Sequence, residues 1–166
     1  AYEYGGAGTA DKIRSAQVRE CDRARDEHLE HETMQNCVGA LMKYDYASLR
    51  HIAVQLLWHT GVRMGSGRAL CVGDWYPEEE YISIKHRPET GTPLKREYQG
   101  ESHISILDSD LCTALEDWVE NRRPDVQDAH GREPLLATSV DRASKNTLRN
   151  TTYRATQPCE YAGHCP

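Results

Sequence analysis

The spacing of apolar residues changes along this chain, and the change limits what it can fold into. In residues 34–42, and again in 47–59, apolar side chains recur every three or four positions. This spacing places them on one face of a helix, so it predicts two successive helices that share a core. In 81–84 and 103–106 apolar and polar residues alternate instead, which predicts two strands of an antiparallel hairpin with a long loop.

Capping and terminating residues mark the remaining elements. Gly61 can take the left-handed conformation that ends a helix, and Asp108 or Ser109 can cap the helix that carries Trp118 and stops before Pro124. The sequence also predicts a short helix over 64–70, an extended piece over 135–138 and a last helix that begins at Ser144, carries Leu148 and a core Tyr153, and ends before Pro158. The predicted fold class is α+β, mainly helical, with one antiparallel β-hairpin.

Length and charge restrict the class of protein. The 166 residues fit one domain, and the net charge of -6 excludes binding to DNA through overall charge, so any nucleic-acid surface must be a local group of basic residues. No apolar run approaches the roughly 20 residues of a membrane span, and the first residues show no signal pattern. We therefore expect a cytoplasmic protein with no membrane partner, and its scattered cysteines favour reduced thiols over disulfides.

A Thr60-Gly61-Val62-Arg63 turn follows the second predicted helix, and the hairpin loop contains Thr92-Pro93-Leu94-Lys95-Arg96. Followed by the Leu/Trp helix, this order resembles the catalytic domain of the tyrosine recombinases, the phage-integrase family. The strings at 43–48, 56–65, 86–95 and 156–161 are similar to the integrases of halophilic archaea in particular. The resemblance implies that 31–166 is the N-terminal part of such a catalytic domain, and that 1–30 is a linker or an inter-domain helix.

The resemblance also implies roles for individual residues. Arg63 matches the first catalytic arginine, and its guanidinium suits a phosphodiester because it donates two parallel hydrogen bonds to non-bridging oxygens. Lys95 matches the lysine that gives a proton to the leaving 5'-hydroxyl, while strict counting from Arg63 falls closer to Lys85, which stays the alternative. The implied reaction breaks and rejoins DNA through a 3'-phosphotyrosyl intermediate and needs no cofactor for catalysis.

The sequence departs from the family pattern in three ways. Ser66 stands where an acidic residue commonly follows the first arginine, no His-x-x-Arg motif follows the hairpin, and no tyrosine has the spacing of the nucleophile. We expect Tyr153 in the core and Tyr161 in a loop. The departures predict a truncated catalytic domain that is inactive alone because its nucleophile is missing.

Further basic residues are expected to contact double-stranded DNA, on which the intact protein is expected to form a homo-oligomer: Arg68, His86, Arg87, Arg96, Lys145 and Arg149. Cys159 and Cys165, with His164 between them, are candidate ligands of a structural zinc that residues beyond this chain would complete.

Two other interpretations stay open from the sequence. One is a non-catalytic DNA-binding or zinc-stabilised interaction module on the same scaffold. The other is a helical regulatory domain in which Thr-Gly-x-Arg is only a turn.

Overall fold

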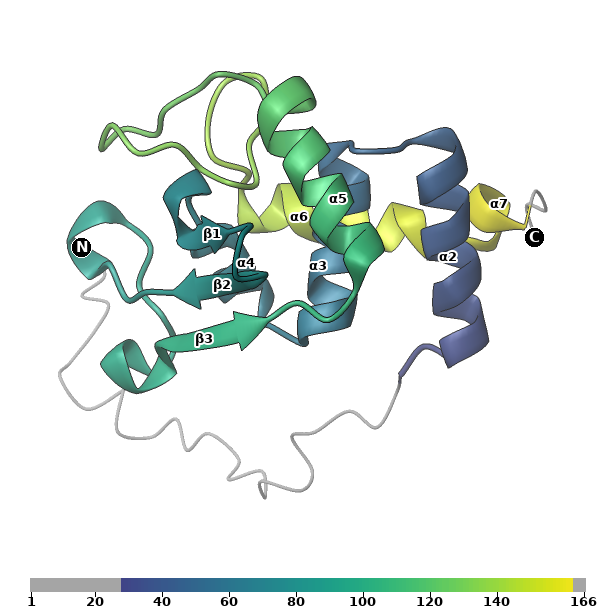
Figure 1. Ribbon diagram of the computed structural model, residues 1–166, viewed down its shortest axis with the longest axis horizontal. Helices are drawn as coiled ribbons and strands as arrows, with labels where there is room; N and C mark the ends of the chain where they lie inside the picture. Colours follow the sequence, from purple (N-terminus) through teal and green to yellow (C-terminus); the bar gives the residue numbers. More distant parts are fainter. Residues whose placement is uncertain (1–27, 163–166) are drawn as a thin grey trace, which may run out of the picture.

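A computed structural model describes residues 28–162 and shows helices packed beside a small sheet (Figure 1). The expected linker over 1–30 lies almost wholly outside the described residues. None of the described helices combines the length and apolar character that a bilayer crossing requires. The α-helices are α2 (His31–Tyr44), α3 (Leu49–Thr60), α4 (Met64–Ala69), α5 (Ser109–Asp117), α6 (Lys145–Ala155) and α7 (Pro158–Tyr161).

Local capping explains where the central helices begin and end. The Ser48 hydroxyl accepts a hydrogen bond from the His51 N–H at the start of α3, and Gly61 ends that helix with φ of 63°. Asp108 caps α5, and Ser144 caps α6 in the same way. The predicted stop at Gly61 and the cap at Ser144 are confirmed, and Asp108 rather than Ser109 caps α5; the Ser48 cap was not predicted.

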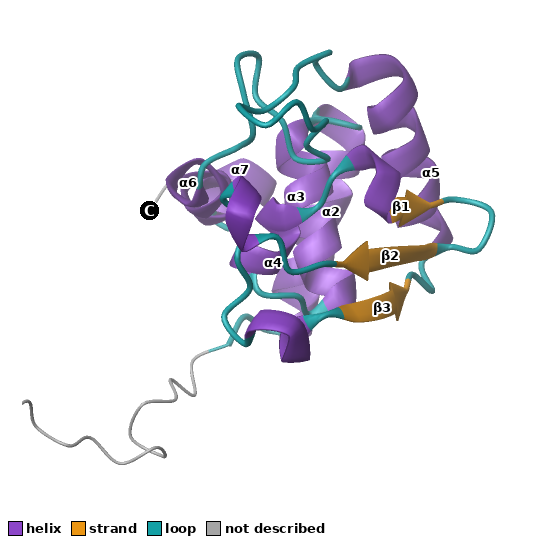
Figure 2. Cartoon of the chain, turned by 90° about the vertical axis from the view of Figure 1, so that its left-hand side faces the viewer, coloured by secondary structure: helices purple, strands orange, loops and turns teal. Residues whose placement is uncertain are grey.

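The sheet has three antiparallel strands in the order β1 (Trp75–Tyr76), β2 (Tyr81–Ile84) and β3 (Ser102–Ser105), as Figure 2 shows. The β2–β3 hairpin is confirmed, with Ile82 opposite Ile104. The sequence missed β1, because two residues are too short to show a period of two. The long connection between β2 and β3 contains two 3₁₀ turns, η3 (Pro88–Thr90) and η4 (Glu97–Gly100).

The main core surrounds α3, which packs against α2, α5 and α6. Its fully buried side chains include Ile52, Leu56, Ile82 and Leu115. The α2 and α7 helices lie together at the end of the molecule opposite the sheet (Figure 1).

Tyr153 is not a core residue, so that prediction is wrong. The α6 helix buries Leu148 and Ala155, which lie two turns apart on one face, and Tyr153 lies on another face with 68% of its surface exposed. Tyr161 ends the short helix α7 rather than lying in a loop. Pro158 begins that helix, because proline fits the first turn.

The segment between α5 and α6 has little regular structure and still contributes to the core. A π-helical turn (Trp118–Arg122) ends α5, and Leu135 and Leu136 are both buried. The Trp118 indole N–H donates to the Leu135 carbonyl over 2.8 Å. This bond fixes the segment onto the helical body, where it approaches the hairpin connection.

We predict that Leu135→Ala lowers the free energy of unfolding by about 2–5 kcal/mol, because it leaves a cavity in a fully buried position. Leu107→Ala is the matched control: Leu107 is 96% exposed, and its loss should change that free energy by less than about 0.5 kcal/mol. Urea unfolding of both variants provides the measurement. Equal effects of the two substitutions would contradict the packing described here.

Candidate functional site

Three basic side chains from separate segments surround one hollow of about 400 Å³. Arg63 comes from the start of α4, Lys95 from the β2–β3 connection and Lys145 from the start of α6. We call this hollow, with its lining, the basic hollow; the other lining residues are Gly65, Ser66, Pro93 and Leu94. The fold thus brings together the predicted pair Arg63 and Lys95.

The position of Arg63 follows from the turn that precedes it. Gly61 ends α3 in the left-handed conformation, and Arg63 is then the N-cap of α4 with extended backbone. Its carbonyl accepts hydrogen bonds from the N–H groups of Ser66 and Gly67 over 2.8 and 3.0 Å. The backbone of Arg63 is therefore fixed by the helix, while its side chain is exposed.

Lys95 extends from a segment that is anchored on both sides. Leu94 is buried, and its N–H donates to His86 Nδ1 over 2.9 Å. The His86 N–H in turn donates to the Glu101 carboxylate over 2.8 Å. These bonds hold the backbone of the connection, and the exposed Lys95 side chain extends from it into solvent.

Lys145 is the first residue of α6, directly after the Ser144 cap. Its side chain passes over α4, where a Cβ on Gly65 would lie 3.7 Å from Lys145 Cε. The α4 and α6 helices pack against each other. The ammonium group is therefore held on the same side of α4 as the hollow.

Within residues 28–162, the side chains of Arg63, Lys95 and Lys145 have neither an ion pair nor a hydrogen bond. Three unneutralised cations around one hollow produce a positive potential that attracts an anion. The guanidinium can donate two parallel bonds to neighbouring oxygens, and each ammonium can donate bonds in several directions. A phosphate group fits this set of donors.

Lys85, the alternative to Lys95, lies elsewhere. Its ammonium is 3.0 Å from an oxygen of the buried Asp74 carboxylate, and the bond to Asp74 raises the pKa of Lys85. Burial alone would raise the pKa of Asp74, but hydrogen bonds from Arg87, the Cys71 N–H and Lys85 hold it below its usual value. Lys85 does not line the basic hollow. The geometry favours Lys95 for a role beside Arg63.

The other predicted DNA contacts have different environments. Arg87 donates to both Asp74 oxygens, over 2.9 and 2.6 Å, so its guanidinium is already bound within the protein. Arg68 donates to the carbonyls of Ala143 and Gly91. Arg96 is exposed beside Lys95, and Arg149 is exposed on α6.

The candidate zinc ligands are only partly described. Cys159 is half-buried at the start of α7, and its Sγ lies 3.9 Å from Gln157 Oε1. His164 and Cys165 lie outside the described residues. No group of three metal-binding side chains occurs among residues 28–162.

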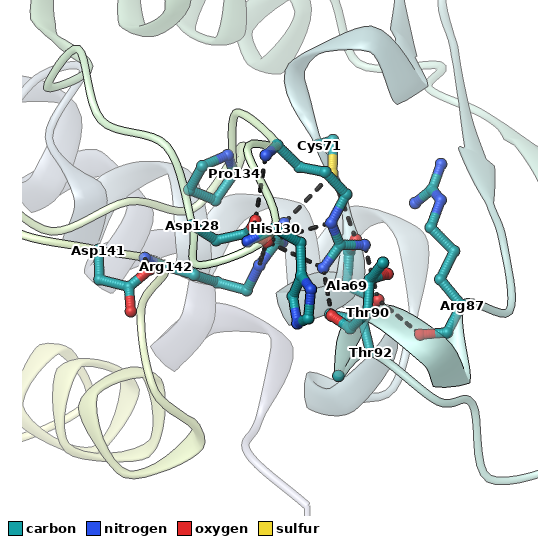
Figure 3. A network of polar contacts seen from close by, with 12 residues as sticks. Ala69, Cys71, Arg87, Thr90, Thr92, Asp128, His130, Pro134, Asp141 and Arg142 are labelled. Atoms are coloured by element: carbon teal, nitrogen blue, oxygen red, sulfur yellow. Dashed lines mark hydrogen bonds and ion pairs between the residues drawn. The ribbon is translucent and has the colours of Figure 1, made fainter.

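No sequence motif indicated a role for Asp128 or Arg132, which belong to a polar network beside the hairpin connection. Asp128 lies within this network in Figure 3. The Asp128 carboxylate accepts bonds from the guanidinium groups of Arg132 and Arg142. Asp128 and its partners are far from Arg63 and Lys95 in sequence, and a single Asp in a loop carries no local signal of such a role.

Comparison with known proteins points to recombinases. The chain is 28% identical over 123 residues to a probable site-specific recombinase in the afa region from Escherichia coli, covering 71% of this chain and 46% of that protein. It also resembles the crystal structure of XerA recombinase, with a TM-score of 0.58, 16% identity and coverage of 81% of this chain and 43% of that chain. No family model matches the sequence.

The described fold, mostly helical with a three-stranded antiparallel sheet, matches the fold of a recombinase catalytic domain. The similarity in sequence to a probable site-specific recombinase agrees with the resemblance of the motifs, and the similarity in structure is one of fold. The chain spans less than half the length of either protein.

We predict that the free energy of unfolding falls as the pH drops below about 4, the usual value for aspartate. The folded pKa values of Asp74 and Asp128 are lowered, so the unfolded chain binds more protons in this range. Asp74→Asn should lower the free energy of unfolding by roughly 1–3 kcal/mol at neutral pH. It should also make this free energy fall less steeply with decreasing pH. Urea unfolding across a pH series measures both effects, and curves of equal steepness for the two proteins would contradict the prediction.

Proposed function

We propose that this chain contributes the first part of the catalytic centre of a tyrosine-type site-specific recombinase, and that its substrate is double-stranded DNA. The observation that supports this most directly is the basic hollow, in which unpaired Arg63, Lys95 and Lys145 surround a space suited to a phosphate. The sequence similarity to a probable site-specific recombinase and the similarity of fold to XerA recombinase support the same proposal.

In this proposal the hollow holds the phosphodiester that is cut. Arg63 donates two hydrogen bonds to non-bridging oxygens, whose charge increases as a tyrosine oxygen, its proton given up to a base outside these residues, attacks phosphorus. As the bond between phosphorus and the 5'-oxygen breaks, Lys95 transfers a proton to the leaving oxygen. The product is a 3'-phosphotyrosyl link and a free 5'-hydroxyl. In the reverse steps the 5'-hydroxyl of another strand attacks the phosphorus, which rejoins the DNA and releases the tyrosine.

The remaining parts of the proposal concern the whole protein. The nucleophile and a second arginine would come from residues outside this sequence, which spans less than half of its relatives. We propose a phage-integrase type of the haloarchaeal kind, acting in the cytoplasm as a homo-oligomer on DNA. Cys159 and Cys165 would belong to a structural zinc site completed by further residues.

A non-catalytic DNA-binding module is the second candidate, and one observation favours it. Within the described part of the chain, no tyrosine lines the basic hollow. Tyr153 is exposed on α6, and Tyr161 lies in α7. These 166 residues alone would then bind DNA without cutting it.

We predict that Arg63→Ala, Lys95→Ala and Lys145→Ala each weaken binding of the chain to duplex DNA. Non-specific affinity is expected on the order of 10⁻⁵ M, and because the three cations share one phosphate, loss of all three should reduce the slope of log K against log salt by about 0.9. Fluorescence anisotropy with a labelled duplex at several salt concentrations measures both quantities. Arg122→Ala removes an exposed cation outside the hollow and is the matched control.

If Arg122→Ala reduces the salt slope as much as Arg63→Ala, charge alone explains binding, and the hollow is not the site.

We further predict that the 166-residue chain forms no covalent adduct with DNA. A nicked duplex traps phosphotyrosyl intermediates, and denaturing gel electrophoresis separates any adduct from the free protein. An adduct that disappears in Tyr153→Phe or Tyr161→Phe would show that the chain carries its own nucleophile.

A further inference from the structure

One carboxylate, that of Asp128, joins the segments that bear the three cations of the basic hollow. Its side chain is 7% exposed and accepts from Arg132 and Arg142, each with a closest distance of 2.9 Å. Its other oxygen accepts the N–H groups of His130 and Arg132 over 3.0 and 3.1 Å. Both guanidinium groups are therefore held in fixed orientations by one carboxylate; Figure 3 shows Arg142 beside Asp128.

The Arg132 guanidinium reaches the β2–β3 connection. It donates to Thr92 Oγ1 over 3.0 Å and to the Thr90 carbonyl over 2.6 Å. Thr92 is buried and lies three residues before Lys95. We call these contacts the Arg132 arm and those of Arg142, described next, the Arg142 arm. The Arg132 arm fixes the backbone just before the segment from which Lys95 extends.

The Arg142 guanidinium reaches the far end of α4. It donates to the carbonyls of Arg68 and Leu70 over 2.8 and 2.9 Å. The Arg68 carbonyl lies in the last turn of α4, where carbonyls lack an intrahelical partner, and the Leu70 carbonyl also accepts the Leu135 N–H over 3.0 Å. Arg142 also lies just before Ser144, the cap of the helix that begins with Lys145. This arm fixes α4, and with it Arg63, relative to α6.

We propose that Asp128 is the positioning residue of the basic hollow: through Arg132 it sets the place of Lys95, and through Arg142 that of Arg63 and Lys145. The inference rests on the proposed function, since it concerns the binding of a DNA phosphate by these cations. Asp128 does not itself line the hollow, so it acts only through the two arginines.

The contacts of Arg132 and those of Arg142 act on different cations of the hollow. The positioning role therefore predicts selective effects on DNA binding that a general loss of stability would not produce. Arg132→Lys keeps a positive charge beside Asp128, but an ammonium cannot donate to Thr90 and Thr92 with the geometry of the guanidinium. Asp128→Asn weakens both arms at nearly constant volume. Asp125→Asn, on an exposed carboxylate of the same segment, is the matched control.

The experiment combines each of these variants with Lys95→Ala and with Arg63→Ala in the full 166-residue chain, and measures anisotropy with the labelled duplex. Circular dichroism first establishes a temperature at which every variant is folded. In the Arg132→Lys background we expect Lys95→Ala to lose most of its effect on affinity and slope, while Arg63→Ala keeps its full effect. In the Asp128→Asn background both effects should shrink, and in Asp125→Asn neither should.

If Lys95→Ala lowers the affinity as much in the Arg132→Lys background as in the unmodified chain, the positioning role is wrong. This comparison tests the role even if Asp128→Asn fails to fold. Failure of the proposed function looks different. In that case Arg63→Ala and Lys95→Ala change nothing in the unmodified chain, before any network variant is introduced.

Discussion

The Asp128 carboxylate, held between two arginines, connects parts of the chain that are remote in sequence. Its partners lie in a segment with little regular structure, and they bind the hairpin connection through Thr92 and the end of α4 through Leu70. A buried carboxylate is costly unless it is paired, and here two guanidinium groups and two backbone N–H groups compensate it. The hollow exists because these elements meet at fixed positions.

Charge is divided in this acidic chain between cations that are neutralised and cations that are not. Lys85 and Arg87 share Asp74, and Arg132 and Arg142 share Asp128, so these four stabilise the fold. Arg63, Lys95 and Lys145 are left for an external anion. A net charge of -6 therefore does not oppose a local phosphate site, and it limits binding elsewhere on the surface.

Features set by neighbouring residues could be predicted, whereas those set by tertiary contacts could not. Caps such as Asp108 and Ser144, the stop at Gly61 and the β2–β3 hairpin follow from local spacing, and the structure has them. The two-residue strand β1 and the exposure of Tyr153 depend on packing. Arg63 and Lys95 came from the motif resemblance, but spacing could not decide between Lys95 and Lys85. Ser66 replaces an acidic residue of the family pattern, and this local difference did not indicate that Arg142 fixes the opposite end of α4.

If one DNA phosphate is bound by Arg63, Lys95 and Lys145 together, these three side chains respond to DNA as a single site. Nuclear magnetic resonance of the isotope-labelled chain, titrated with a short duplex, observes the side-chain signals of these three residues in solution. All three signals should shift with a common dissociation constant, while the signals of Lys85 and Arg122 stay in place. Shifts confined to another surface, with the three signals unmoved at saturation, would contradict this prediction.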